Sequence, residues 1–288
     1  MIEWLASHGV DEVVLACGFL PDQLEKVLGN GGDGGPNLHY VVEPEPLGTA
    51  GAIKFAEDHL DDRFFALNGD VLTDLDLTAL WNSHLERGAS ASLGLYPVED
   101  PTGYGLVDID DAGQVLDFHE KPGTGHTGAG LINAGTYVLE KSVLLDLPAG
   151  REVSIEREVF PNLIGRGLSG LRLDGYWMDI GTPDRYLEAS WDIVEGRVNT
   201  LVETNSEGMH VGTDCEITTG ARIGPRAVIG NRSQIGAGAS IVDSVLISDC
   251  QIGENAVISG SILSPGVQVA AGARVENMVL GKNELVSA

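Results

Sequence analysis

Isoleucine recurs at every sixth position in the last third of this 288-residue chain. The series comprises Ile217, Ile223, Ile229, Ile235, Ile241 and Ile247, and after a one-residue slip it resumes with Ile252 and Ile258. A maintained six-residue repeat is typical of a parallel β-helix, in which three short strands complete one coil. Each isoleucine is expected to stack on its counterpart in the next coil and to contribute about 1.5–3 kcal/mol when fully buried. The repeat therefore predicts a β-helix domain over residues 201–288.

The same kind of repeat is found in acyltransferases, which need a catalytic histidine between neighbouring coils. His210 lies at the entrance of the repeat and outside its period, which disfavours acyl transfer. The flank and the end of a solenoid often pack against another subunit, so a homo-oligomer is compatible with this domain.

The chain is strongly acidic, with 43 acidic and 17 basic residues and a formal net charge of −26 at pH 7. This charge disfavours binding to nucleic acid or to an anionic membrane surface. No apolar run is long enough to span a bilayer, and the first residues do not resemble a signal peptide. Cys17, Cys215 and Cys250 are too widely spaced for a zinc motif or a disulfide framework. We therefore expect a cytoplasmic protein in a reducing compartment.

The apolar run Phe64-Phe65-Ala66-Leu67 predicts a short buried strand of a largely parallel sheet. Asn68 and Gly69 break this strand, so Asp70 is expected at its carboxyl end. Ligands of open α/β sheets bind beyond the carboxyl ends of the strands, where a carboxylate can hold a metal ion. Because Asn, Gly and Asp all favour turns, an ordinary turn is the alternative interpretation.

The start of the chain is unusual for a doubly wound domain, which normally opens with a strand and a phosphate-binding turn. Residues 1–8 predict a helix, and Glu12 to Cys17 predict the first strand. The next segment, Pro21 to Leu28, predicts a helix whose residues Leu24, Val27 and Leu28 face inward. The domain is therefore expected to be incomplete at its N-terminus.

Two segments carry residue types suited to nucleotides and sugars. Gly48 and Thr49 begin a predicted helix, where small residues let a base or a phosphate approach the backbone. In Glu120-Lys121-Pro122, the lysine can hold a phosphate while the glutamate accepts sugar hydroxyls. Ordinary helix capping and a surface ion pair are the respective alternatives.

Two further polar residues interrupt apolar segments. Asn133 lies within a predicted core strand, residues 131–139, and needs a hydrogen-bond partner that is either internal or a ligand. Asp179 places a second carboxylate between apolar neighbours, and Pro183 begins another predicted helix. Ser154 is expected to cap the start of a helix with an acidic first turn.

Six motifs in this order resemble the nucleotide-sugar pyrophosphorylases, also called sugar-1-phosphate nucleotidyltransferases. They are Glu-Pro-Leu-Gly-Thr-Ala-Gly (45–51), Asn-Gly-Asp (68–70), Glu-Lys-Pro (120–122), Ile-Asn-Ala-Gly (132–135), Ser-Ile-Glu-Arg-Glu (154–158) and Trp-Met-Asp-Ile-Gly-Thr-Pro (177–183). The resemblance implies an α/β fold, with a Rossmann-like nucleotidyltransferase domain over residues 1–200 and a left-handed parallel β-helix of hexapeptide repeats over residues 201–288.

The resemblance also implies an activity, the transfer of a nucleotidyl group from a nucleoside triphosphate to a sugar 1-phosphate. Within the family, the motifs are most similar to those of enzymes that use GTP and mannose 1-phosphate, while thymidylyl, uridylyl and adenylyl transfer to glucose 1-phosphate stay open. The implied roles are Mg²⁺ binding and catalysis by Asp70 and Asp179, sugar-phosphate binding and catalysis by Lys121, and sugar contacts by Gly105, Glu120 and Asn133. Glu43 and Gly48 are implied to lie near the base, and Thr49 is a further expected substrate-binding residue.

One family feature is absent from this sequence. Members open with a strand and a Gly-rich loop that carries an Arg and is followed by a Lys-Pro pair, which together hold the triphosphate. We therefore expect an N-terminally shortened version of a longer chain, with a non-catalytic regulatory or scaffolding subunit as the alternative. The pair Asp70 and Asp179 argues against that alternative, because a subunit without a metal has little need of both.

Overall fold

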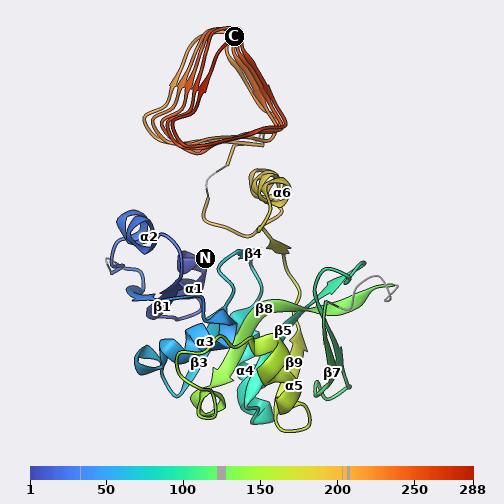
Figure 1. Ribbon diagram of the computed structural model, residues 1–288. Coiled ribbons are helices and arrows are strands. Elements are labelled where there is room, and N and C mark those ends of the chain that lie inside the picture. The colour runs from blue at the N-terminus through green and yellow to red at the C-terminus, as the bar shows by residue number, and fades with distance from the viewer. Residues whose placement is uncertain (33, 122–127, 203, 206–207) are drawn as a thin grey trace. The chain divides into compact units, whose positions relative to one another are not determined.

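The computed structural model describes residues 1–32, 34–121, 128–202, 204–205 and 208–288 (Figure 1). The chain divides into two compact units, one formed by Met1–Gly69 with Leu75–Trp177 and the other by Asp70–Asp74 with Met178–Ala288. In the described part of the chain, no helix has both the length and the apolar character needed to cross a membrane. The first unit is an α/β unit and the second contains the β-helix, so the expected fold class is confirmed.

A six-stranded mixed sheet forms the centre of the first unit. Its strands are β3 (Arg63–Leu67), β5 (Ala91–Val98), β6 (Gly105–Ile109), β7 (Val115–Glu120), β8 (Gly130–Glu140) and β9 (Leu168–Arg172), in the order β7-β6-β8-β5-β9 with β3 also paired to β8. Strand β5 is buried on both faces over its first five residues, which explains why its sequence is apolar without alternation. The long strand β8 is the common partner of β3, β5 and β6.

The expectation of a largely parallel sheet around Phe64 was wrong. Strand β3 runs antiparallel to β8, and β5–β9 is the parallel pair among the pairings of this sheet. Within β3, Phe64 is the one buried residue and the others are half-buried, because the strand has a sheet neighbour on one side. A short apolar run indicates burial, but it carries no information about strand direction.

Helices cover this sheet and complete the apolar core. They are α3 (Gly48–Phe55), α4 (Leu77–Arg87), α5 (Phe160–Leu163), the single-turn helices η1 (Glu57–His59) and η3 (Lys141–Leu144), and the π-helix η4 (Ile155–Val159). Ser154 caps η4 as expected, because its hydroxyl accepts a hydrogen bond from the amide of Arg157 at 3.3 Å. The buried rings of Tyr137 and Phe160 meet edge to face, which fixes α5 against β8.

The first 42 residues form a separate small sheet within this unit. Strand β1 (Glu12–Cys17) pairs in parallel with β2 (Asn37–Val42), flanked by α1 (Ile2–Ser7) and α2 (Pro21–Leu28). The predicted bounds of α2 are confirmed. The prediction that its apolar residues face inward was wrong, because Val27 is 81% exposed, Leu28 is also exposed and Leu24 is only half-buried. A two-stranded sheet has too little surface to bury a full helix face.

The β-helix of the second unit consists of three parallel sheets. They comprise β11 (Met209–Val211), β14 (Ala227–Ile229), β17 (Val245–Leu246), β20 (Ile262–Leu263) and β23 (Val279–Leu280); β12 (Glu216–Ile217), β15 (Gln234–Ile235), β18 (Gln251–Ile252), β21 (Gln268–Val269) and β24 (Leu285–Val286); and β13 (Arg222–Ile223), β16 (Ser240–Val242), β19 (Val257–Ser259) and β22 (Arg274–Glu276). This arrangement is the one expected for a left-handed β-helix.

The coil spacing changes once along the β-helix. Ile217 pairs with Ile235, eighteen residues later, whereas Ile235 pairs with Ile252, seventeen residues later. The five-residue step therefore falls one repeat earlier than the isoleucine series indicates, between Ile241 and Leu246, and Leu246 occupies the core while Ile247 is 41% exposed. The prediction that Ile247 stacks in the core was wrong, because a five-residue step from Ile241 brings Leu246 to the inward position.

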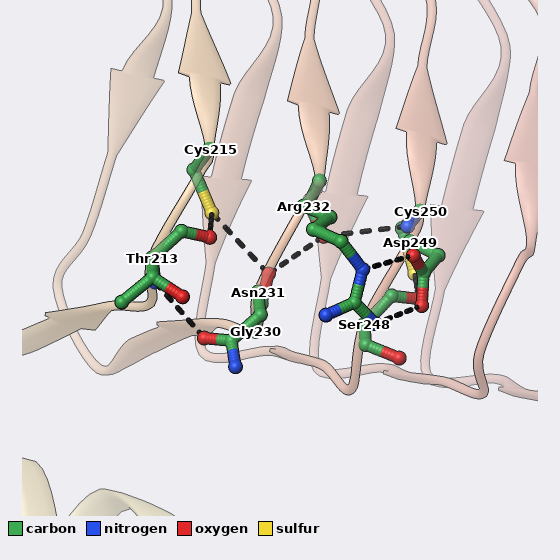
Figure 2. Close-up of polar contacts among 9 residues, drawn as sticks. Thr213, Cys215, Gly230, Asn231, Arg232, Ser248, Asp249 and Cys250 are labelled. Atoms are coloured by element: carbon green, nitrogen blue, oxygen red, sulfur yellow. Dashed lines mark hydrogen bonds and ion pairs between the residues drawn. The ribbon is translucent and has the colours of Figure 1, made fainter.

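Polar side chains join successive coils at one corner of the β-helix (Figure 2). The Asn231 side chain accepts a hydrogen bond from the amide of Thr213 at 2.9 Å, and Arg232 forms a bidentate ion pair with Asp249 at 2.7 and 2.8 Å. The three cysteines of the chain are free thiols, and burial raises the pKa of Cys250 at this corner.

Two short strands and one helix that contribute to the second unit lie outside the β-helix. Strand β4 (Val71–Thr73) pairs with β10 (Trp177–Asp179), and α6 (Pro183–Val194) begins after the capping residue Thr182. Leu187 of α6 packs against Val245 and Ile262 on the outside of the β-helix. The helix thereby covers apolar side chains that one β-helix face directs outward.

Stability of the first unit is expected to fall as the pH drops through about 6.5, the pKa of an unperturbed histidine, because of His84. This side chain is buried, with Nδ1 2.8 Å from Ser92 Oγ and Nε2 3.1 Å from Glu140 Oε1, and burial lowers its pKa. The unfolded chain therefore takes up a proton near pH 6.5 before the folded chain does. The contribution of His84 to the free energy of unfolding is fully present above that pH. It falls by up to about 1.4 kcal/mol per pH unit as the pH drops towards the pKa of His84 in the folded chain.

Urea denaturation followed by fluorescence at several pH values measures this slope. The variant His84→Gln, which cannot take up the proton, is expected to have a flatter profile over the same range. An equal slope in both proteins would contradict the assignment to His84.

Candidate functional site

Three of the predicted sugar-binding residues converge at one end of the mixed sheet. Gly105 at the start of β6 pairs with Glu120 at the end of β7, and Asn133 lies on the neighbouring strand β8. A Cβ atom on Gly105 would lie 3.0 Å from Glu120 Oε2 and 3.5 Å from Asn133 Cβ. A side chain at Gly105 would therefore crowd the Glu120 carboxylate and the Phe118 ring, which lies 3.1 Å from the same Cβ position.

Asn133 finds its partner within the protein, which was one of the two expected outcomes. Its Nδ2 donates to the Tyr137 hydroxyl at 2.8 Å, and its Oδ1 accepts from the Gly135 amide at 3.1 Å. The register of β8 against β5 shifts between these residues, and Gly135 adopts a left-handed conformation with φ of 66°. This irregularity lets the two side chains meet.

Glu156 joins this cluster from the π-helix η4. Its Oε1 accepts from the Tyr137 hydroxyl at 3.4 Å, and its Oε2 accepts from Ser154 Oγ at 2.8 Å and Thr49 Oγ1 at 3.4 Å. Sequence reasoning included Glu156 in a motif without giving it a role, and it assigned no role to Tyr137. The spacing of Tyr137 four residues after Asn133 on one strand was the available signal.

The electrostatics of the cluster favour hydrogen bonding to neutral hydroxyl groups. Burial and the negative charge of Glu156 raise the pKa of Glu120, partly offset by the positive charges of Lys121 and Arg157. Burial also raises the pKa of Tyr137, so its hydroxyl remains a donor at neutral pH. Carboxylates that accept and an amide that donates are the groups with which proteins bind sugar hydroxyls.

The predicted base-binding segment lies at the start of α3. The Glu43 carboxylate accepts a hydrogen bond from the amide of Leu47 at 3.0 Å, and Gly48 adopts φ of 67°. A Cβ atom on Gly48 would lie 2.7 Å from the carbonyl oxygen of Val153, so the backbone approach at this position requires glycine. Thr49, the next residue, contacts Glu156, whereas the Glu43 carboxylate is engaged within its own loop.

Lys121 directly follows β7, beside Glu120. It is exposed and has φ of 51°, and its amide donates to the carbonyl of Tyr104 at 3.2 Å. Its neighbour Pro122, which was expected to fix it, lies outside the described residues. The role of Lys121 in holding phosphate stays a prediction.

The two predicted metal-binding aspartates lie together in the second unit. The amide of Gly181 donates to Asp179 Oδ1 at 2.8 Å, and the amide of Ile180 donates to the carbonyl of Asp70 at 2.9 Å. A Cβ atom on Gly181 would lie 3.0 Å from Asp179 Oδ1 and 3.6 Å from Asp70 Oδ2, so both carboxylates face the space that this glycine leaves.

This arrangement fits Mg²⁺, which is commonly held by one or two carboxylates together with water and substrate phosphates. Over the described ranges, no group of three or more His, Cys, Asp or Glu side chains is arranged to hold a metal ion.

Each of these aspartates follows, by two residues, a group anchored to β8. The amide of Asn68 donates to the carbonyl of Gly135 at 2.8 Å, and Trp177 Nε1 donates to the carbonyl of Ala134 at 2.8 Å. Both accepting carbonyls belong to residues that follow Asn133 directly in the sequence. Strand β8 therefore anchors Asn68 and Trp177, which lie two positions before the two aspartates in the sequence.

Two family models match the chain. Residues 1–196 match a model described as nucleotidyl transferase, and residues 206–287 match one described as GMPPB C-terminal domain. Curated relatives include a mannose-1-phosphate guanylyltransferase of Mycobacterium tuberculosis, 34% identical over 85% of this chain and 69% of the relative. A probable mannose-1-phosphate guanylyltransferase 2 of Arabidopsis thaliana is 36% identical over 99% of this chain and 82% of the relative.

Solved structures agree with these matches. The crystal structure of HddC from Yersinia pseudotuberculosis is 32% identical, with a TM-score of 0.57 over 65% of this chain and 80% of that one. HddC complexed with GMP-PN aligns with a TM-score of 0.55, 30% identity and the same coverage.

Proposed function

The chain belongs to the nucleotidyl transferase family, and we propose that it catalyses the transfer of GMP from GTP to mannose 1-phosphate, giving GDP-mannose and pyrophosphate. The observation that supports this most strongly is the hydrogen-bonded set Asn133, Tyr137 and Glu156, together with Glu120, which lies beside Gly105 near Asn133. It combines acceptors and a donor for sugar hydroxyls with an adjacent lysine for a phosphate.

In the proposed reaction, a phosphate oxygen of the sugar 1-phosphate attacks the α-phosphorus of the triphosphate in line, and pyrophosphate leaves. Glu120 and Asn133 hold the sugar hydroxyls, and Lys121 holds the phosphate that carries the attacking oxygen. These contacts convert a bimolecular encounter into an oriented one, and no covalent intermediate is needed. Glu43, Gly48 and Thr49 are proposed to lie near the base.

Asp70 and Asp179 are the residues that would hold Mg²⁺. The bound ion would neutralise charge on phosphate oxygens. The Gly181 amide keeps the Asp179 carboxylate in place through its hydrogen bond.

The choice of GTP and mannose rests on relatives. Curated relatives in bacteria, plants and yeasts carry the name mannose-1-phosphate guanylyltransferase or guanyltransferase, and HddC was solved in complex with GMP-PN. The test is a panel that compares kcat/KM for GTP, UTP, dTTP and ATP, each with mannose 1-phosphate or glucose 1-phosphate. GTP with mannose 1-phosphate is expected to give the highest value, and preference for another pair would overturn this assignment.

The variant Lys121→Ala is expected to raise the KM for the sugar 1-phosphate by about ten- to hundredfold. A charge-assisted hydrogen bond contributes roughly 1.5–3 kcal/mol, and each 1.4 kcal/mol corresponds to a factor of ten. The KM for the nucleotide should change much less. Steady-state kinetics with each substrate varied separately measure this difference, with Lys282→Ala as a control because Lys282 is an exposed lysine of the β-helix. An unchanged KM for the sugar phosphate would rule out the proposed role of Lys121.

A further inference from the structure

We propose that Glu156 is a positioning residue that couples nucleotide binding at the start of α3 to sugar binding at Asn133. Its carboxylate contacts Thr49 on one side and Tyr137 on the other, and Tyr137 contacts Asn133. The inference rests on the proposed function, because it takes these two ends as the nucleotide and sugar positions.

Helix α3 is closely connected to the segment that leads to Glu156. The Val153 carbonyl accepts hydrogen bonds from the amides of Ala50 at 2.9 Å and Gly51 at 3.3 Å, and the Val153 amide donates to the carbonyl of Leu47 at 2.8 Å. A Cβ atom on Gly51 would lie 2.6 Å from the carbonyl oxygen of Arg151. Two backbones in such close contact are expected to move together.

The Glu156 carboxylate accepts hydrogen bonds from three hydroxyl groups. Ser154 holds Oε2 from within the same turn, so the carboxylate has one preferred orientation. In that orientation Oε2 also meets Thr49, and Oε1 meets Tyr137. A displacement of the start of α3 therefore acts directly on Glu156.

Tyr137 connects Glu156 to Asn133 at the proposed sugar position. Tyr137 is buried, and its single hydroxyl proton is directed to Glu156, so the same oxygen can accept from the Asn133 amide. Because Asn133 Oδ1 is held by the Gly135 amide, the orientation of the side chain is fixed. One N–H of the amide is then available for a sugar hydroxyl.

The charge of Glu156 reaches the sugar position by a second route. It helps to raise the pKa of Glu120, the other acceptor of the cluster. Coupling between two binding sites is reciprocal and is typically five- to 150-fold in affinity. We therefore expect the nucleotide to tighten sugar-phosphate binding, and the sugar phosphate to tighten nucleotide binding by the same factor.

Calorimetry on the full chain tests this inference. The Kd of mannose 1-phosphate is measured with Mg²⁺ alone and with Mg²⁺ plus a non-hydrolysable GTP analogue. The Kd without the analogue divided by the Kd with it is the coupling ratio, which is expected to be about fivefold or more in the wild type. In Glu156→Gln, Tyr137→Phe and Thr49→Val, each of which breaks the path at a different point, the ratio should fall to less than about twofold.

Glu152→Gln is the matched control, because Glu152 is an exposed carboxylate in the segment that packs on α3. It should retain the wild-type ratio. Thr49→Val keeps the shape of the side chain, so a loss of coupling in this variant cannot be ascribed to unfolding when its thermal transition matches that of the wild type.

The outcomes separate the inference from the proposed function. Wild-type ratios in Tyr137→Phe and Thr49→Val, or a ratio of one in the wild type, would overturn the coupling while leaving the activity in place. A wild type that binds neither the GTP analogue nor any sugar 1-phosphate would overturn both.

Discussion

Asp70→Asn and Asp179→Asn are each expected to reduce pyrophosphate release by about a thousandfold or more. Both carboxylates face the space beside Gly181, and an amide in place of either removes one negative charge and one strong cation ligand. Charge stabilisation by a bound metal is worth several kcal/mol at the transition state, and each 1.36 kcal/mol is a factor of ten in rate.

A direct binding measurement separates this effect from a loss of folding. Mn²⁺ binding followed by electron paramagnetic resonance should weaken in both variants while circular dichroism stays unchanged. Asp184→Asn is the control, because Asp184 is an exposed aspartate at the start of α6. Turnover at the wild-type rate in either Asp70→Asn or Asp179→Asn would refute the assignment of that residue to the metal site.

Gly230→Ala is expected to destabilise the β-helix by roughly 3 kcal/mol or more, at the upper end of the cost of forcing extra atoms into a packed core. A Cβ atom on Gly230 would lie only 1.6 Å from the carbonyl oxygen of Ile247 in the next coil. The hydrogen bond from the Gly230 amide to the Leu246 carbonyl, at 2.7 Å, must therefore lengthen or break. Steric overlap with a backbone atom cannot be relieved by a change of rotamer.

Gly281→Ala is the matched control, because Gly281 also follows the inward-facing residue of a strand in this sheet, after Leu280 of β23. Its Cβ atom would meet only Glu284 Oε2, at 3.5 Å, which is an ordinary contact. Urea denaturation followed by circular dichroism measures both variants. A Gly230→Ala protein whose midpoint equals that of Gly281→Ala would contradict the predicted overlap.

The period of the sequence was sufficient to predict the β-helix, but not the register of every coil. Each strand of the repeat contributes one inward side chain, so a six-residue spacing of isoleucine identifies the architecture. At the slip, the inward position is taken by Leu246, and Ile247 follows it on the outside. A leucine is as suitable for the core as an isoleucine, so the pattern of isoleucine alone misplaced the slip by one repeat and the inward position by one residue.

Local sequence patterns predicted where helices and strands begin and end, but not which elements pack against them. The bounds of α2 and β1 were predicted correctly from Pro21 and from the apolar run that ends at Cys17. The exposure of Val27 and the direction of β3 were not, because both depend on which strands lie next to each element. Sequence periodicity describes a face, not its partner.

In the candidate site, too, the sequence motifs identified some residues and missed others. The motifs named Glu120 and Asn133, and the structure brings them together at Gly105. They gave no role to Tyr137 or to the Glu156 carboxylate, whose contact with Thr49 spans 107 positions of the chain. Contacts over such separations depend on the tertiary fold, and no local pattern indicates them.

The central claim is that this chain joins a nucleotide to a sugar 1-phosphate. The most direct test incubates the full chain with GTP, mannose 1-phosphate and Mg²⁺ and identifies the products by mass spectrometry. We expect GDP-mannose and pyrophosphate in equal amounts, with neither formed when the sugar phosphate or the metal is left out. Failure to form a nucleotide sugar from any pairing of a nucleoside triphosphate with a hexose 1-phosphate would contradict the account.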